Sequence, residues 1–374
     1  MLKYILLFIR KGKLMKNNHN LLMKMKNLEK FSGAIKRCVA IAMASMLFAT
    51  TGFSLDTHPV KAQEVSSSAD KIEIPEISKD AFKKYKKISG IGANTILGAD
   101  FTYYQQCLEW GKSYKNYMSQ SVDNIFDYVK SQGINTISLK VAVNPTGENA
   151  YLSLENAIKT LKAVKASNTN LKTNLVLLYS DEITYAGTQN LPADWEKAEK
   201  EEQSVTRVES AKTYTRETIA KLKQANVLPD IVTIGNEVNW NFLGITDGEG
   251  WEGWKAMGDI SALLKKEGVK NAVSIAAQPD AASVKYIVQK LGYASVDYDY
   301  IGVNVYPDNN PNSYIKSLKN EVESCAPDKQ LIVSNVEYER VNEANTANVY
   351  TQADSIYNLL EATIDEKNGV HPVK

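Results

Sequence analysis

A short apolar run with a polar end, Ile231-Val232-Thr233-Ile234-Gly235-Asn236-Glu237, lies near the middle of the chain. A run of the same kind, Leu331-Ile332-Val333-Ser334-Asn335-Val336-Glu337, follows later in the sequence. Strand-length segments that are apolar on both faces predict strands of a buried parallel sheet. Because parallel strands end at the same edge of a sheet, we expect the two terminal carboxyls to share that edge.

Five further runs extend the predicted sheet on both sides of residues 231–237. We predict strands at Thr95–Phe101, Thr136–Val143, Asn174–Tyr179, Ile231–Gly235, Ala272–Ala277, Tyr300–Val305 and Leu331–Val336. Polar residues follow the carboxyl ends of these strands, namely Asp100, Asn144, Ser180, Asp181, Asn236, Glu237, Gln278, Tyr306 and Glu337. Helical patterns lie between the strands. In the first of them, apolar residues recur at helical spacing from Val122 to Val129, with Ser121 as the predicted cap.

The alternation of strands and helices predicts right-handed βα units around a parallel sheet. No glycine-rich nucleotide-binding motif follows any strand. Polar clusters at the carboxyl ends of the strands are typical of barrel enzymes. We therefore predict an α/β fold, a (β/α)8 TIM barrel. The sequence ends at Lys374, where an eighth strand would begin, so we expect the barrel to lack that strand.

The composition excludes several classes of chemistry. Among the 374 residues the only histidines are His19, His58 and His371. A Ser-His-Asp triad or a histidine-bound catalytic zinc is therefore not expected within residues 59–370. Three cysteines are too few for a Cys₄ zinc site. We expect no metal and no cofactor, and the general acid or base must be a carboxylate, lysine, tyrosine or cysteine.

The N-terminal segment is typical of a secretory signal. A basic region ends at Lys36-Arg37, an apolar run extends from Val39 to Phe53, and Val60-Lys61-Ala62 fits the signal-peptidase rule. The alternative, a membrane anchor, needs roughly 20 apolar residues, more than this run provides. We predict an extracellular protein without membrane attachment after cleavage. The predicted parts are a signal region (1–62), a linker (63–89) and the barrel domain (90–374).

The charge of the remaining chain argues against nucleic acid as a partner. Residues 1–62 hold 11 of the 44 basic and 2 of the 43 acidic residues, so residues 63–374 have a net charge of about −8. Tyrosine is abundant, with 20 residues, and Trp240 follows the fourth predicted strand beside Asn239. Both favour contacts with sugar rings, and the alternative for Trp240 is packing in the core or at the rim. The acidic stretch 247–250 lacks the spaced ligands of a known calcium loop, so a structural calcium is not supported.

Glu237 and Glu337 are the candidate catalytic residues. Glycosidic cleavage needs one protonated carboxyl to assist the leaving oxygen and one ionised carboxyl at the anomeric carbon. A separation of about 5–5.5 Å would indicate retention of configuration, and about 6.5–9.5 Å inversion. Glu339 lies on the same side of its strand and is an alternative to Glu337. A single strand-end glutamate can instead be a salt-bridge partner or a helix cap.

An ordered set of motifs resembles glycoside hydrolase family 53, the arabinogalactan endo-β-1,4-galactanases of clan A. The matching segments are Gly98-Ala99-Asp100, Gly133-Ile134-Asn135, Val143-Asn144-Pro145, Tyr179-Ser180-Asp181, Gln189, Pro192 to Trp195, Ile234-Gly235-Asn236-Glu237 with Asn239, Asp299-Tyr300-Ile301-Gly302, Tyr306-Pro307 and Val336-Glu337. They occur in family order over residues 93–340, which is most of the chain after residue 62.

The resemblance implies a retaining hydrolase in which Glu237 is the acid/base and Glu337 the nucleophile. It also implies that Asn236 binds the 2-hydroxyl of the sugar and that Tyr306 orients the nucleophile. We expect a polysaccharide substrate, galactan or arabinogalactan, and a monomeric protein. The expected substrate contacts are Asn236, Asn239, Trp240, Tyr306 and Asp181.

Several cleft positions depart from the family pattern. Residues 138–142 are Ser-Leu-Lys-Val-Ala where the family usually has Arg-Leu-Arg-Val-Trp, and Leu178 replaces a histidine. Two alternatives follow from these differences. The first is a divergent barrel, catalytically weak or inactive, that binds plant glycan. The second is a clan A hydrolase of another β-linked polysaccharide.

Overall fold

In the part of the chain that the structure describes, seven parallel strands form one curled sheet. The computed structural model describes residues 84–85, 88, 91, 95–116, 120–201, 206–248, 250–276, 280–305, 311–336 and 348–364. In order across the sheet the strands are β1 (Gly98–Asp100), β4 (Thr136–Val141), β5 (Lys172–Leu177), β6 (Ile231–Ile234), β9 (Lys270–Ile275), β10 (Tyr300–Val305) and β11 (Gln330–Val336). All seven predicted strands are confirmed.

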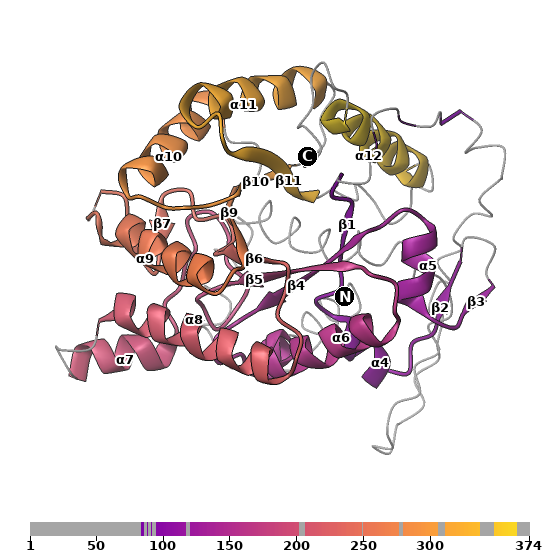
Figure 1. Cartoon of the computed structure of the whole chain (residues 1–374), viewed down its shortest axis with the longest axis horizontal. Helices are drawn as coiled ribbons and strands as arrows, with labels where there is room; N and C mark the ends of the chain where they lie inside the picture. Colours follow the sequence, from indigo (N-terminus) through magenta and orange to yellow (C-terminus); the bar gives the residue numbers. More distant parts are fainter. Residues whose placement is uncertain are drawn as a thin grey trace, which may run out of the picture.

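The strand order equals the sequence order, as expected for consecutive βα units. Figure 1 shows the helices on the outer side of the curled sheet, from α6 and α8 round to α11. The helical segments are α4 (Tyr104–Glu109), α5 (Ile125–Ser131), η2 (Gly147–Leu152), α6 (Leu154–Ala166), α7 (Ala193–Glu201), α8 (Arg207–Gln224), α9 (Glu252–Lys266), α10 (Ala281–Tyr293), α11 (Pro311–Cys325) and α12 (Asn348–Ile364). Among the described residues, β1 and β11 are the two edges of the sheet, so the barrel is incomplete there.

The predicted cap of the first helix is wrong. Ser121 lies in β3 (Ser121–Val122), which pairs with β2 (Tyr114–Lys115) in a small antiparallel sheet. The helix begins later, and the side chain of Asn124 accepts hydrogen bonds from the backbone N–H groups of residues 126 and 127. Asparagine is as good an N-cap as serine, so spacing alone did not separate the two. A second hairpin, β7 (Asn241–Phe242) with β8 (Ile245–Thr246), follows β6.

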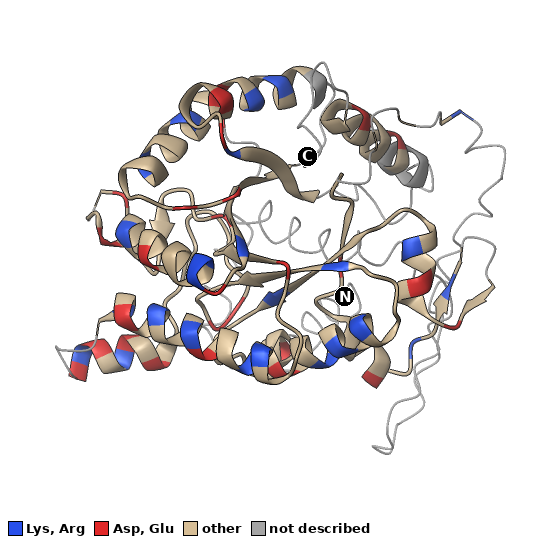
Figure 2. Ribbon diagram, in the orientation of Figure 1, with Lys and Arg blue, Asp and Glu red and all other residues tan. Residues whose placement is uncertain are grey.

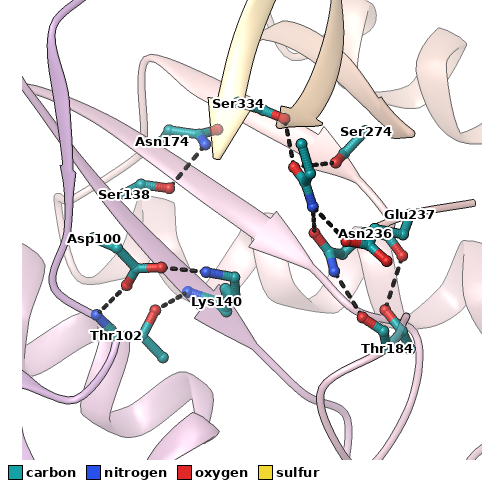
Figure 3. A network of polar contacts seen from close by, with 11 residues as sticks. Asp100, Thr102, Ser138, Lys140, Asn174, Thr184, Asn236, Glu237, Ser274 and Ser334 are labelled. Carbon is teal, nitrogen blue, oxygen red and sulfur yellow. Dashed lines mark hydrogen bonds and ion pairs between the residues drawn. The ribbon is translucent and has the colours of Figure 1, made fainter. Parts of the chain in front are cut away.

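Alternation along the strands puts one face against the helices, while the other, inner face mixes polar side chains with apolar ones such as Ile231 and Tyr300. In β4, Leu139 and Val141 are fully buried in the main hydrophobic cluster under the helices. Ser138 precedes Leu139 and lies on the opposite face, where its Oγ accepts a hydrogen bond from Asn174 Nδ2 of β5 at 3.1 Å. The inner face of the curled sheet therefore carries hydrogen-bonded polar side chains (Figure 3).

The end of the predicted linker contacts the last described helix. Lys84 Nζ and Tyr85 Oη both donate to the carboxylate of Asp354 in α12 at 2.8 Å. The ring of Tyr85 lies 5.0 Å from that of Tyr357. These contacts fix the chain just before the barrel against its outer layer.

Figure 2 shows Lys and Arg interspersed with Asp and Glu along the outer helices. Mixed signs of this kind give no extended basic face. None of the described helices is both long enough and apolar enough to cross a bilayer. The predicted signal region lies outside the described residues, as do Tyr306, Glu337 and Glu339.

Candidate active site

A tight turn after β6 places two predicted site residues at the mouth of the barrel. Gly235 has φ +69° and Glu237 has φ +56°, both in the left-handed region. A Cβ atom on Gly235 would overlap Cγ1 of Val238, so glycine is required by space as well as by conformation. The turn leaves the side chains of Asn236 and Glu237 about 5% exposed. A buried carboxyl at this place needs hydrogen-bond donors.

Both oxygens of the Glu237 carboxyl have a donor. Asn304 Nδ2, from β10, donates to Oε1 at 2.8 Å. The backbone N–H of Ala186, in the loop after β5, donates to Oε2 at 2.9 Å. Two donors from two different elements hold the carboxyl in one orientation. Figure 3 shows Glu237 beside Asn236 and Thr184.

Asn304 links Glu237 to three strands. Its Nδ2 also lies 3.3 Å from Asn236 Oδ1. Its Oδ1 accepts a hydrogen bond from Ser334 Oγ of β11 at 2.8 Å and a longer one from Ser274 Oγ of β9 at 3.4 Å. The site therefore extends from β6 across β10 to β11, the strand that Glu337 directly follows in the sequence.

A second set of bonds holds the backbone of the turn. Gln189 Nε2 lies within hydrogen-bond distance of three carbonyl oxygens, those of Tyr185, Asn236 and Glu237, at 3.0, 2.9 and 3.2 Å. Thr184 and Asn236 bond each other twice: Asn236 Nδ2 donates to Thr184 O, and Thr184 Oγ1 donates to Asn236 O. The loop after β5 is thus tied directly to the turn after β6.

The other described residues predicted to bind substrate lie in different surroundings. Asp181 accepts backbone N–H bonds from Asn144 and Ala193 at 2.9 and 3.0 Å, which joins two loops at the mouth. Asn239 is buried, and its Oδ1 accepts a hydrogen bond from the N–H of Ala276. Trp240 is 41% exposed. Tyr306 and Glu337 lie outside the described residues.

A buried ion pair lies deeper in the barrel mouth. Lys140 of β4 forms a salt bridge with Asp100 at the end of β1, and the two side chains are 8% and 20% exposed. The N–H of Thr102 also donates to Asp100 at 2.8 Å. Burial alone would raise the pKa of Asp100, but the charge and hydrogen bond of Lys140 together with Thr102 lower it below its usual value.

The aspartate of the acidic stretch 247–250 is engaged by side chains of the protein. Asp247 accepts hydrogen bonds from Trp254 Nε1 at 2.8 Å and from Tyr286 Oη at 2.6 Å. Lys290 lies 3.5 Å from the same carboxylate. Within the described ranges, no group of three or more His, Cys, Asp or Glu side chains is arranged to hold a metal ion. Trp254 is buried, whereas Trp251 is 39% exposed.

Sequence reasoning missed four contributors to the Glu237 network. They are Ala186, Ser274, Asn304 and Ser334. One of these, Asn304, is an amide inside the otherwise apolar strand β10, and that interruption was a readable signal. Ala186 contributes only its backbone, which no residue-type pattern can reveal.

A curled parallel sheet surrounded by helices, with a buried carboxyl at the carboxyl ends of its strands, defines an α/β-barrel protein with its site at the barrel mouth. The family model described as glycosyl hydrolase family 53 matches residues 96–369. The chain belongs to glycosyl hydrolase family 53.

Two curated relatives bear the name arabinogalactan endo-beta-1,4-galactanase. The protein of Cellvibrio japonicus is 29% identical over 232 residues, which cover 59% of each chain. The protein of Thermothelomyces thermophilus is 28% identical over 253 residues, covering 63% of this chain and 70% of its own length. The chain thus spans only about 59% of the first relative.

Solved structures of the same family share the fold. The GH53 catalytic domain of Ignisphaera aggregans superposes with a TM-score of 0.63 at 20% identity, covering 76% of this chain and 85% of that one. A structure of two fungal beta-1,4-galactanases gives a TM-score of 0.56 at 23% identity, covering 65% and 74%. These likenesses confirm the predicted TIM-barrel fold.

Proposed function

We propose that the chain is a retaining endo-glycosidase that hydrolyses β-1,4-galactosidic bonds in galactan or arabinogalactan. One observation carries the proposal. The buried carboxyl of Glu237 is held at the mouth by Asn304, and Asn304 is bonded in turn to Ser334 in β11. Glu337 follows the end of that strand. Membership of family 53 and relatives named as galactanases support the choice of substrate.

The proposed reaction proceeds in two steps. In the first, Glu237 gives its proton to the glycosidic oxygen while a carboxylate oxygen of Glu337 bonds to the anomeric carbon, and the C–O bond to the leaving sugar breaks. In the second, Glu237 takes a proton from water, whose oxygen replaces Glu337 at that carbon. Two inversions give net retention. The acid of the first step is the base of the second, so its protonation state is restored.

The remaining predicted contacts complete the proposal. The amide of Asn236 donates one N–H to Thr184 and accepts one hydrogen bond from Asn304. Its second N–H and the second lone pair of its oxygen remain for the 2-hydroxyl of the sugar. Trp240 offers an exposed indole face for stacking. Asp181, Asn239 and Tyr306 are proposed as further substrate contacts at the mouth, and polysaccharide as the partner of a monomeric chain.

The test is release of reducing sugar from β-1,4-galactan by the full chain. Glu237→Gln and Glu337→Gln each keep size and remove the ionisable group. We expect each to lower kcat at least a thousandfold, because each removes a group the reaction requires. Glu217→Gln, on an exposed part of α8, is the matched control and should keep the full rate.

Three outcomes separate the alternatives. Galactan cleavage that both site variants abolish supports the proposal. Cleavage of β-linked glucan or mannan in place of galactan would replace the substrate while keeping the mechanism. Binding of galactan without any release by a folded protein would replace the enzyme by a glycan-binding barrel. An inverted product anomer, observed by NMR during hydrolysis, would overturn the retaining mechanism.

Secretion is proposed separately. Residues 1–62 have the basic, apolar and small-residue order of a signal. Expression in a bacterial host and N-terminal sequencing of the protein in the medium should give a chain that begins near Gln63. Recovery of the unprocessed chain from the membrane fraction would contradict this.

A further inference from the structure

Asn304 is a buried amide in the middle of an apolar strand. It is 2% exposed and lies in β10 between Val303 and Val305. An amide in such a position must find partners for both of its ends. Its oxygen accepts hydrogen bonds from two serine hydroxyls, and its nitrogen donates to side-chain oxygens of two residues in the turn after β6.

The orientation of this amide follows from its partners. Nδ2 faces Glu237 Oε1 and Asn236 Oδ1, and an amide oxygen accepts but never donates. The reversed amide would place its own oxygen against these two oxygens. Ser334 and Ser274 can donate to the oxygen of the observed orientation. The site therefore admits one orientation of Asn304.

A local irregularity of the sheet aims Ser334 at Asn304. Val303 pairs with Val333, but Asn304 pairs with Asn335, so Ser334 is an extra residue in β11. Bulges of this kind redirect a side chain and are common near active sites. Gly302 makes room for it, since a Cβ there would lie 2.8 Å from Cβ of Ser334. The bulge, the glycine and the amide form one arrangement that ends at Glu237.

We propose that Asn304 is a positioning residue, oriented by Ser334, that holds the Glu237 carboxyl in the direction in which it exchanges its proton with the substrate. The inference rests on the proposed function for the identity of the reaction. In this proposal the bulge of β11 serves the reaction, because it directs Ser334 toward Asn304. Asn304 acts through Glu237 and not on the substrate.

The first test compares two leucine variants. Asn304→Leu keeps the size of the side chain and removes its donor, whereas Asn174→Leu makes the same change on the inner face of β5, where the amide contacts Ser138 and Thr233 instead. On galactan we expect Asn304→Leu to lower kcat about a hundredfold, the range of one general acid/base contribution, with KM changed less than threefold. Asn174→Leu should keep kcat within about threefold.

The dependence on the leaving group separates positioning from packing. A galactobioside with a dinitrophenolate leaving group needs no proton at the departing oxygen. The loss in Asn304→Leu should therefore shrink to less than about tenfold for the step that releases dinitrophenolate. Asn304→Asp, which brings a second carboxyl against Glu237, should move the alkaline limb of the pH–rate profile to higher pH. Ser334→Ala should lower kcat on galactan about tenfold.

Crystal structures of the two leucine variants test the positioning of Glu237 without measuring the reaction. We expect the Glu237 carboxyl to leave its position in Asn304→Leu and to keep it in Asn174→Leu. A wild-type chain without activity would overturn the proposed function, yet the two structures would still decide the positioning. The inference would be overturned if Glu237 keeps its position in Asn304→Leu and kcat is unchanged. It would also be overturned if Asn304→Leu loses equal activity on galactan and on the dinitrophenyl galactobioside. If Asn304→Leu does not fold, Ser334→Ala gives the same two readouts.

Discussion

The N–H of Ala186 points at Glu237 and donates to Oε2 at 2.9 Å. Ala186 is in a four-residue turn in which Tyr185 and Thr188 exchange backbone hydrogen bonds at 3.2 and 2.9 Å. Gly187 has φ +78°, and Ala186 is not among the residues with positive φ. A positive φ at the third residue of the turn but not at the second is the pattern of a type II turn, with Ala186 at its second position. The turn thus presents one backbone donor to the carboxyl.

This geometry permits a variant that removes only that donor. Proline is favoured at the second position of a type II turn, and it lacks an N–H. We expect Ala186→Pro to keep the thermal midpoint within a few degrees and to lower kcat on galactan about tenfold, the value of one hydrogen bond to a charged group. Ala186→Ser keeps the N–H and should keep the rate. A full rate in Ala186→Pro would show that the bond does not serve the reaction.

The turn after β6 predicts a stability difference between two glycines. Gly235 and Gly268 have similar positive φ values, +69° and +73°. A Cβ on Gly235 would overlap Val238, whereas none of the described atoms lies within 4 Å of a Cβ on Gly268. We expect Gly268→Ala to cost about 1–2 kcal/mol from conformation alone. Gly235→Ala should cost about 2–4 kcal/mol, because overpacking is added. Urea unfolding of both measures the difference; equal losses would contradict the steric reason.

The strands were predictable because their signal is local. Runs such as Ile231–Ile234 and Tyr300–Val305 are apolar on both faces, and only a sheet covered on both sides satisfies such a run. The carboxyl ends of parallel strands meet at one edge, so placing Glu237 at the mouth needed no further information. The first helix start was misjudged because Ser121 and Asn124 are equally suitable caps.

The network around Glu237 was not predictable because it depends on register. Ser334 reaches Asn304 only because β11 contains one extra residue, and the pairing of two strands is invisible in either strand alone. The contribution of Ala186 depends on a turn type and a backbone atom. Asn304 is the exception, since an amide inside an apolar strand indicates a buried partner without naming it.

The ion pair of Asp100 and Lys140 predicts how stability depends on pH. The pKa of Asp100 is lowered in the folded chain, so the unfolded chain binds its proton first as the pH falls. The stabilisation is complete above the unfolded pKa of about 3.9 and is lost as the pH falls through the lower folded value. Asp100→Asn should cost about 3–5 kcal/mol at pH 7, because it leaves Lys140 charged and buried.

The control for this prediction is an exposed pair. Glu155 and Lys159 lie on α6 with 77% and 54% of their side chains exposed. Glu155→Gln should leave the unfolding free energy nearly unchanged, since water and salt screen such pairs. The cost of Asp100→Asn, measured by urea unfolding, should shrink as the pH falls below about 4. A cost that stays constant down to pH 2 would assign the loss to packing and not to charge.

Trp240 predicts a change in substrate affinity without a change in chemistry. Its indole is 41% exposed, and its ring centroid lies 5.6 Å from that of Tyr286, which supports it from one side. The carbonyl of Trp240 also accepts a hydrogen bond from the N–H of Asp247 at 2.8 Å, which fixes the backbone beneath the ring. A rigid indole with a free face can stack on a sugar ring, and such aromatic contacts are worth about 0.5–1.5 kcal/mol.

Trp240→Ala should therefore raise KM for galactan about three- to tenfold and leave kcat within about twofold. The effect should grow with the chain length of galacto-oligosaccharides until the sugar beside Trp240 is occupied, and then stay constant. Tyr293→Ala, at the far end of α10 where the ring is 75% exposed, is the control and should change neither constant. A fall in kcat with unchanged KM would place Trp240 in the chemical step. The reason is that losing a contact made equally in the ground state and the transition state raises KM, whereas losing a contact made only in the transition state lowers kcat.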